Sequence, residues 1–205
     1  MKIGILNLPG SNIFSVKYWL KRNGFKSIIL SEPGDLNLIE LMILPGVGSF
    51  DTAMEFINSK KFNHPINQFI EKNKIIIGIC CGMQILFNSS EEGVLSGLSV
   101  LKGHISRIPI GKDKVPNIGW RSIDCFINSN KKIFNFYFMH SYGLDLEKNN
   151  LDPSINYIST VYCNTTLLAS FQYNNIYGFQ YHPEKSYDSG DKLLNNIINE
   201  IKSNS

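Results

Sequence analysis

The sequence predicts an α/β fold: an open, mostly parallel sheet with helices on both faces, extended by an antiparallel β-rich part. In the first half of the 205-residue chain, short apolar runs alternate with amphipathic stretches, which is typical of strands and helices around a parallel sheet. From about residue 94 to 182, β-branched and aromatic runs between turn residues indicate antiparallel strands. The length suits a single domain over residues 1–205.

The expected elements follow in chain order. Each expected strand of the first half is a short apolar run, and these runs occupy 2–8, 26–30, 41–46 and 74–80. Apolar residues at helical spacing predict a helix over 11–23, which Gly24 ends. A second helix is expected over 51–73, broken near Pro65, and a third helix is expected to begin after residue 80. One apolar stripe predicts a last helix over 190–202.

Composition excludes several classes of function. Hydrophobic residues make up 43% of the chain and charged residues 18%, as in an ordinary globular protein. The net charge is only +3 and the sequence contains no run of Lys or Arg, so nucleic-acid binding is not expected. The N-terminus lacks a signal-peptide layout and no apolar run is long enough to span a bilayer. Four cysteines, two of them adjacent, suggest free thiols rather than disulfides. We therefore expect a cytoplasmic protein that does not engage a membrane.

Cys80 is the candidate nucleophile. It stands in the segment G-I-C-C-G at 78–82, after the most hydrophobic expected strand. Flanking glycines permit the sharp strand-to-helix turn of a nucleophile elbow, and free N–H groups at the helix start favour a thiolate. A lone cysteine is more often a structural core residue, but this placement favours a nucleophile. Cys81 is expected to pack into the core with its N–H facing an oxyanion, and Cys125 and Cys163 are expected to be packing residues.

His182 and Glu184 are the candidate base and its orienting acid. They stand two residues apart in G-F-Q-Y-H-P-E, and residues two apart on a strand point to the same face. Glu184 can then accept from one ring nitrogen of His182 while the other nitrogen faces Cys80. Zinc deaminases also contain an H-x-E pair, but they need a downstream P-C-x-x-C that does not follow His182 in this sequence. No metal site is expected.

A glycine-rich turn, L-P-G-V-G-S-F at 44–50, follows the third expected strand. Backbone N–H groups of Gly46, Val47 and Gly48 can face a developing negative charge, because chemistry in open parallel sheets collects beyond the carboxyl ends of the strands. By itself, P-G-x-G more often marks only a tight turn. Its place on the same sheet edge as Cys80 favours an oxyanion site.

These three segments, in this order, resemble the class I (triad) glutamine amidotransferases, and the resemblance covers essentially the whole chain. The motifs G-x-C-x-G-x-Q at 78–84 and H-P-E at 182–184 are specific to that class. Three further segments narrow the resemblance to the glutaminase subunits of imidazole glycerol phosphate synthase. They are K-V-P-N-I-G-W at 114–120, Y-F-M-H-S-Y at 137–142 and H-P-E-K-S at 182–186.

The resemblance implies roles for these residues. Cys80 would attack the side-chain amide of L-glutamine, forming a thioester and releasing ammonia, while His182 moves the proton and Glu184 holds His182. Backbone N–H groups of residues 46–48 and Cys81 would stabilise the tetrahedral intermediate. The implied glutamine-binding residues are Gln84, His140, Ser141 and Tyr142. The implied partner is a (β/α)₈-barrel cyclase of histidine biosynthesis, in a heterodimer. The positions implied to face it are Asn117, Trp120 and Lys185. No metal or organic cofactor is implied.

The sequence departs from the family pattern in three places. The family has Asp-Tyr-Gly-x-Gly-Asn after the first strand, where residues 7–12 read N-L-P-G-S-N. In the family segment Pro-His-x-Gly-Trp-Asn, the His is replaced by Asn117 and the last Asn by Arg121. The family's G-I-C-L-G-M-Q has become G-I-C-C-G-M-Q. The first two departures lie in segments that bear on the partner, so they concern the partner more than the chemistry.

Four functions stay open from the sequence alone. A glutaminase subunit in histidine biosynthesis comes first, and the same chemistry could instead supply ammonia to a surface-sugar amidotransferase. The glutamine-pocket motifs argue against a stand-alone cysteine hydrolase or peptidase. The intact Cys-His-Glu set argues against a non-enzymatic subunit. We also expect the isolated chain to be nearly inactive, with the turn at 46–48 as the switch that completes the oxyanion site.

Overall fold

The computed structural model describes residues 1–111, 113–127 and 130–203, without the side chains of 125–131. The first half of the chain forms β1 (Ile3–Leu6), α1 (Ile13–Arg22), β2 (Ser27–Leu30), the 3₁₀ helix η1 (Pro33–Leu38), β3 (Leu41–Leu44), α2 (Phe50–Ser59), α3 (Asn63–Glu71), β4 (Ile75–Ile79) and α4 (Cys81–Gln84). The second half forms β5 (Ser89–Ser90), β6 (His104–Arg107), β7 (Asn117–Ile127), β8 (Asn130–His140), β9 (Tyr142–Leu144), β10 (Asn156–Tyr162), β11 (Thr165–Tyr173), β12 (Ile176–Phe179), η2 (Pro183–Lys185) and α5 (Tyr187–Ser203).

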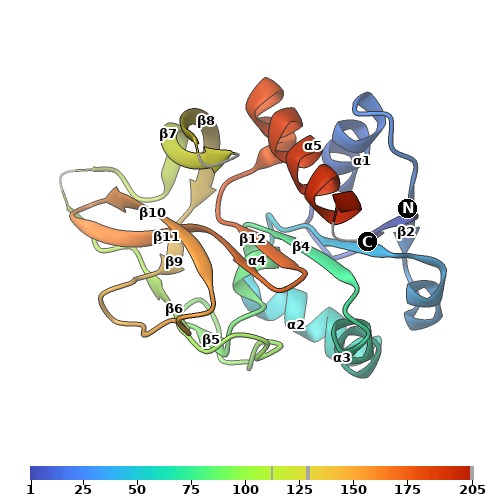
Figure 1. Ribbon diagram of the computed structural model, residues 1–205. Helices are drawn as coiled ribbons and strands as arrows, with labels where there is room; N and C mark the ends of the chain where they lie inside the picture. Colours follow the sequence, from blue (N-terminus) through green and yellow to red (C-terminus); the bar gives the residue numbers. More distant parts are fainter. Residues whose placement is uncertain (112, 128–129, 204–205) are drawn as a thin grey trace.

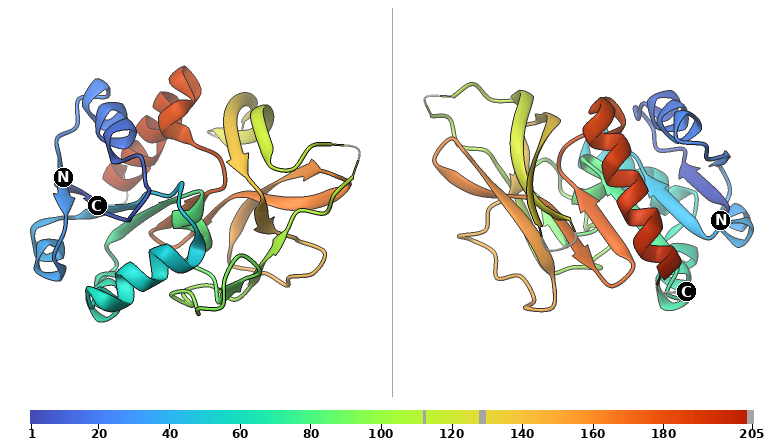
Figure 2. Two further views of the ribbon diagram at one scale, coloured as in Figure 1. Left: turned by 180° about the vertical axis from the view of Figure 1, so that it is seen from behind. Right: turned by 45° about the horizontal axis from the view of Figure 1, so that its top comes forward.

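A seven-stranded sheet organises the described part of the chain, in the order β10-β11-β12-β4-β3-β1-β2. The five strands from β12 to β2 are parallel, and β11 and β10 continue the sheet in antiparallel fashion. Helices α1 and α5 cover one face and α2 and α3 the other (Figures 1 and 2). The predicted fold class, a mostly parallel sheet with an antiparallel extension, is confirmed.

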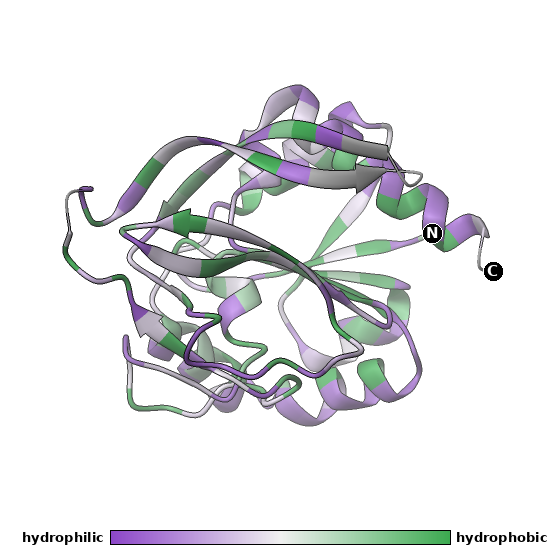
Figure 3. Ribbon diagram, turned by 60° about the vertical axis from the view of Figure 1, so that its left-hand side comes forward, coloured by the Kyte–Doolittle hydropathy of each residue, from purple (hydrophilic) through white to green (hydrophobic). Residues whose placement is uncertain are grey.

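Apolar patterning explains these layers. The strands β1, β3 and β4 are buried along their whole length, as expected for central strands of a covered parallel sheet. Helices α1, α2, α3 and α5 instead bury only some of their residues, and apolar and polar residues are mixed along these helices and along the long hairpins (Figure 3). The side chain of Asn12 caps α1 by accepting from the backbone N–H of Ser15 at 3.1 Å. None of the described helices is both long and apolar enough to cross a membrane.

Strand β12 corrects one sequence expectation. The pattern predicted antiparallel pairing throughout 94–182, but β12 pairs in parallel with β4, with Gly178 opposite Gly78. The chain reverses twice along β10 and β11, so β12 enters the middle of the sheet in the same direction as β4. The carboxyl ends of both strands therefore meet at one edge of the sheet. Cys80 follows β4 at this edge, and the segment leading to His182 follows β12.

The break expected near Pro65 in the helical stretch 51–73 is present and separates α2 from α3, but it lies a few residues earlier. The chain turns between Ser59 and Asn63, where Lys61 adopts a φ of +61°. Pro65 lies in the first turn of α3, where the missing N–H removes no helical hydrogen bond. The proline therefore does not cause the break, which lies before it.

Candidate active site

Cys80 occupies a strained turn between β4 and α4. Its φ of +52° and ψ of −112° are uncommon for a residue with a side chain. The N–H of Cys80 donates to the carbonyl of Phe179 on β12 at 2.7 Å, and its carbonyl accepts from Met83 and Gln84 at 3.0 Å each. The expected elbow is therefore present. Helix α4 has only four residues, so its dipole contributes less than the sequence analysis assumed.

Glycines allow the elbow to fold back on the sheet. A Cβ atom at Gly78 would lie 2.7 Å from the carbonyl oxygen of Gly82, and one at Gly82 would overlap the carbonyl oxygen of Leu44. No larger residue fits either position without moving backbone. The turn that carries Cys80 past the end of β4 thus depends on both glycines.

His182 and Glu184 interact directly, although not as the sequence pattern suggested. Strand β12 ends at Phe179, and Glu184 lies in the 3₁₀ turn η2 instead of on a strand with His182. The N–H of His182 donates to the carbonyl of Tyr137 on β8 at 2.8 Å, which anchors this segment to the β7–β8 hairpin. The turn brings Oε1 of Glu184 to 2.8 Å from Nδ1 of His182.

The electrostatics of His182 favour its charged form. Burial lowers the pKa of His182, but the negative sulfur of Cys80 and the carboxylate of Glu184 outweigh burial and raise the pKa to about 10. Among the described residues, Nε2 of His182 has no hydrogen-bond partner, whereas the Cys80 thiol donates to the carbonyl of Met139 at 3.7 Å. Nε2 of His182 therefore has no competing partner and can exchange a proton with the Cys80 sulfur. This is the arrangement of a cysteine nucleophile with a histidine base.

The glycine-rich turn at 46–48 lies against the elbow. A Cβ atom on Gly46 would lie 2.6 Å from Cβ of Cys81 and would overlap the backbone nitrogen of Gly82. On Gly48 a Cβ atom would lie 2.9 Å from the carbonyl oxygen of Pro9. Val47 between them is half-buried. The structure thus brings the turn and the N–H of Cys81 to the same place beside Cys80.

The four residues expected to bind glutamine are linked through the backbone of the β8–β9 connection. The side-chain amide of Gln84 and the Nδ1–H of His140 both donate to the carbonyl of Tyr142, each at 2.8 Å. Ser141 contributes its carbonyl, which accepts from Ile108 at 2.9 Å. Burial lowers the pKa of His140 to about 4, so its ring is neutral near neutral pH.

The three positions expected to face a partner differ in exposure. Trp120 is 49% exposed and stacks on Tyr187, with ring centroids 5.9 Å apart. Nζ of Lys185 lies 6.0 Å from the ring centroid of Tyr137 beside it. Asn117 corrects the expectation, because it is fully buried and its side chain donates to His140 at 3.1 Å. It lies beneath the surface and does not form part of it.

The other cysteines are buried where the structure describes them. Burial, followed by the charge of the neighbouring Cys80, raises the pKa of Cys81 well above its ordinary value. The thiol of Cys163 donates to the carbonyl of Asp113 at 3.8 Å. The side chain of Cys125 lies outside the described residues.

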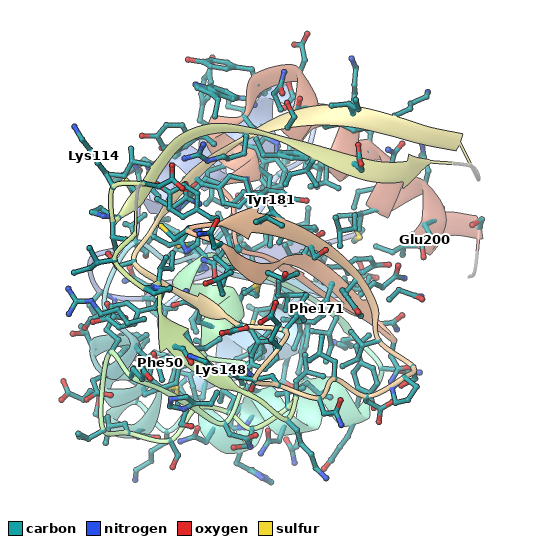
Figure 4. All side chains as sticks on the ribbon, turned by 90° about the vertical axis from the view of Figure 1, so that its left-hand side faces the viewer. Phe50, Lys114, Lys148, Phe171, Tyr181 and Glu200 are labelled. Carbon is teal, nitrogen blue, oxygen red and sulfur yellow. The ribbon has the colours of Figure 1, made fainter. Side chains whose placement is uncertain are left out.

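Gln180 is a site residue that the sequence analysis missed. Its side-chain amide donates to the sulfur of Cys80 at 3.7 Å. Tyr181, the next residue, points the other way and stacks under the β7–β8 hairpin on Phe136, with ring centroids 4.0 Å apart (Figure 4). Residues 180 and 181 form a bend after β12, so the two-residue period of a strand gives no signal for this contact.

Comparison with known proteins agrees with this geometry. Residues 12–201 match the family model described as glutamine amidotransferase class-I. The chain is 37% identical to the imidazole glycerol phosphate synthase subunit HisH of Prochlorococcus marinus (strain NATL2A), over 99% of this chain and 98% of that protein. It is 32% identical to the HisH subunit of Cyanophora paradoxa, over 97% and 94% of the two chains.

Solved structures share the fold at lower identity. A crystal structure of a glutamine amidotransferase matches 96% of this chain and 97% of its own, with a TM-score of 0.77 and 17% identity. The structure of PurLQS from Thermotoga maritima matches 98% of both chains, with a TM-score of 0.75 and 21% identity. The chain belongs to the class I glutamine amidotransferase family and, within it, to the subunits of imidazole glycerol phosphate synthase named HisH.

Proposed function

We propose that this chain is the glutaminase subunit of an imidazole glycerol phosphate synthase. It hydrolyses L-glutamine to glutamate and ammonia and passes the ammonia to a cyclase subunit. One observation carries the proposal above all others: the strained elbow holds Cys80 beside the buried His182–Glu184 pair, in which Nδ1 and Oε1 lie 2.8 Å apart.

The first step forms a thioester. The proton of the Cys80 thiol passes to Nε2 of His182 before glutamine is attacked, because the raised pKa of His182 favours the thiolate–imidazolium pair. The sulfur then attacks the side-chain amide carbon of glutamine. The C–N bond then breaks, and the amide nitrogen takes the proton from His182 and leaves as ammonia. Glu184 stabilises the imidazolium throughout and fixes which nitrogen carries the exchanged proton.

The second step releases glutamate. Water attacks the thioester carbon and gives a proton to His182, which returns it to the Cys80 sulfur as the C–S bond breaks. Both steps pass through a tetrahedral intermediate with a negative oxygen. Backbone N–H groups of residues 46–48 and of Cys81 are the donors for this oxygen, because the turn packs directly on the elbow.

The ammonia acceptor belongs to the same proposal. We assign it to a (β/α)₈-barrel cyclase that forms a heterodimer with this chain in the cytoplasm, since the two relatives described above are HisH subunits. The exposed aromatic pair Trp120 and Tyr187, with Lys185 beside it, is a suitable docking surface: aromatic side chains are enriched at the energetic centres of interfaces.

Glutamine hydrolysis by the co-purified complex of the chain with its barrel partner tests the proposal. Cys80→Ala should abolish glutamate formation, whereas Cys81→Ala should keep it, because only the backbone of Cys81 takes part. Glutaminase activity that survives Cys80→Ala would refute the mechanism. Growth of a deletion strain without histidine identifies the pathway: a requirement for histidine supports the cyclase as acceptor, and unimpaired growth points to a surface-sugar acceptor.

A further inference from the structure

The sulfur of Cys80 has two polar neighbours with opposite effects. Its thiol donates to the carbonyl of Met139 at 3.7 Å, a contact that exists only while the thiol keeps its proton. Gln180 donates its amide N–H to the same sulfur, also at 3.7 Å. This second contact strengthens when the sulfur becomes negative, because hydrogen bonds to charged acceptors are the stronger ones. Gln180 is only 1% exposed, so water does not compete for the contact.

Gln84 fixes the orientation of the Gln180 amide. One N–H of Gln84 donates to the carbonyl of Tyr142 at 2.8 Å, and this carbonyl can only accept. The amide nitrogen of Gln84 also donates to Oε1 of Gln180 at 3.1 Å. With its oxygen held there, Gln180 must turn its nitrogen towards the sulfur. The donor beside Cys80 is therefore assigned by the hydrogen-bond pattern.

The row of hydrogen bonds continues to β7. The Tyr142 carbonyl also accepts from Nδ1–H of His140, so Nε2 of this neutral ring accepts from the side chain of Asn117 at 3.1 Å. Oδ1 of Asn117 accepts from Nε of Arg121 at 3.1 Å. The directions follow from the Tyr142 carbonyl in the middle of the row, which only accepts, and from the Arg121 guanidinium at its outer end, which only donates.

Arg121 is itself held in place. It is half-buried, and its guanidinium carbon lies 4.5 Å from the ring centroid of Tyr162. Asn117 and Arg121 are two of the positions where this sequence departs from the family pattern. The two substituted residues therefore contact each other, through the hydrogen bond at the outer end of the row.

We propose that Gln180 is a further functional residue, whose amide N–H stabilises the thiolate of Cys80. Gln84 and the Tyr142 carbonyl hold this amide in its donating orientation, and the row from Arg121 to His140 positions that carbonyl. The inference rests on the proposed function in taking Cys80 as the nucleophile. The ionisable groups that surround this region are His182, Glu184, Cys81 and His140. Gln180 differs from them because it stays neutral and donates at any pH.

Alkylation of Cys80 by iodoacetamide tests the proposal without glutamine. The rate at Cys80 is measured by peptide mass mapping from about pH 5 to about pH 9, a range in which thiolates of reactive cysteines form. Gln180→Glu keeps the size and the acceptor for Gln84 but replaces the donor at the sulfur by a carboxylate oxygen. Gln180→Leu removes both groups. Both variants should react roughly tenfold more slowly near pH 7, with the rise of the profile moved to higher pH by about one unit.

Gln172→Leu is the matched control. This glutamine lies on the neighbouring strand β11, and its amide donates to Glu200 on α5 at 2.7 Å, so its loss should leave the alkylation profile unchanged. Unshifted profiles for Gln180→Glu and Gln180→Leu would overturn the proposal. A lowered melting temperature with an unshifted profile would do the same, because it would assign Gln180 a purely structural role.

Arg121→Met tests the far end of the row from a half-exposed position. It should move the alkylation profile in the same direction by a smaller amount, roughly twofold to threefold in rate, and Arg121→Lys should restore part of the difference. An unshifted profile for Arg121→Met would overturn the proposed role of the row. None of these outcomes depends on glutamine turnover, whereas glutaminase activity of Cys80→Ala would refute the proposed function alone.

Discussion

At the scale of single residues, the site depends on how two buried histidines differ. His182 lies beside the Cys80 sulfur and Glu184, and these negative groups raise its pKa to about 10. His140 is buried as well, and burial lowers its pKa to about 4. The hydrogen bond to the Tyr142 carbonyl opposes this fall, and the positive charges of His182 and Arg121 add to it. The ring of His182 is therefore suited to hold a proton in catalysis. The ring of His140 stays neutral and has a structural role.

Glu184→Gln tests the orienting carboxylate. The amide keeps the size of the side chain but loses the charge that stabilises the imidazolium of His182, so kcat for glutamine hydrolysis should fall by about 10² or more. The control is Glu55→Gln, an exposed position on α2. If kcat of the complex fell by less than about threefold, Glu184 would have no role in the mechanism.

His140→Gln tests the neutral histidine through stability. Between about pH 6.5 and pH 4 the unfolded chain binds a proton at His140 that the folded chain does not bind, so the stability present above pH 6.5 is lost as the pH falls towards 4. The loss corresponds to about 3 kcal/mol, and the variant should lack it. Urea unfolding of both proteins at neutral and acidic pH measures the difference. Equal acid sensitivity in the two proteins would contradict the assigned pKa.

At the scale of elements, the glycine-rich turn at 46–48 and the elbow form one packed unit. Gly46 approaches Cys81 and Gly82 so closely that a methyl group does not fit. The N-cap of α2 at Ser49 fixes the end of the turn, since its hydroxyl accepts from the N–H of Thr52 at 3.4 Å. The turn can therefore hold donors against the elbow only with glycine at position 46.

Gly46→Ala should disturb this unit. The added methyl group forces the turn away from the elbow, which should destabilise the fold by about 1–3 kcal/mol and lower kcat by about 10²–10³ as an oxyanion donor is displaced. Gly34→Ala is the matched control, because a Cβ atom there meets no other atom within 4 Å. Normal turnover by Gly46→Ala would exclude the turn from the oxyanion site.

The elements also show which features the sequence could predict. The strands β1 to β4 and helix α1 follow local apolar patterns, and their predicted bounds are within a few residues of the observed ones. A break in the helical stretch 51–73 was also predictable, but its position before Asn63 depends on backbone conformation. The parallel direction of β12 depends on long-range pairing, so periodicity could not reveal it.

The same distinction holds for the site. Cys80, His182 and Glu184 stand in contiguous motifs, and the structure brings them together. The contact of Gln180 with Cys80 joins residues 100 positions apart, and it depends on a hydrogen-bond direction set by Gln84. The inward turn of Asn117 likewise depends on its pairing with β8. Such contacts are products of the tertiary fold.

At the scale of the whole molecule, the exposed Trp120 shares strand β7 with Asn117 and Arg121, which form the outer end of the row of hydrogen bonds. A partner that binds the surface around Trp120 would therefore contact the strand that carries the outer end of the row. This arrangement gives a physical route by which docking could affect the site.

Trp120→Ala should weaken binding of the cyclase partner by about 2 kcal/mol, roughly 30-fold in Kd, because a large aromatic contact is lost. Calorimetry with the purified subunits measures the change. Tyr157→Ala is the control, since Tyr157 is similarly exposed at 52% but lies on the edge strand β10. Equal Kd values for the native and Trp120→Ala chains would show that Trp120 is not part of the interface.

The isolated chain should hydrolyse glutamine far more slowly than the complex does. If one oxyanion donor at 46–48 is misplaced without the partner, the expected difference in kcat is about 10²–10³. Assays of the same preparation before and after addition of the cyclase measure it. Equal rates would show that the turn at 46–48 already places its oxyanion donor correctly in the absence of the partner.

The attack of Cys80 on the side-chain amide of glutamine can be tested with an electrophilic diazoketone analogue of glutamine. The complex is treated with this analogue and then examined by peptide mass mapping. A single adduct should form on Cys80, excess glutamine should prevent it, and glutaminase activity should be lost with it. An adduct on another residue, or undiminished activity after Cys80 has been modified, would contradict this role of Cys80.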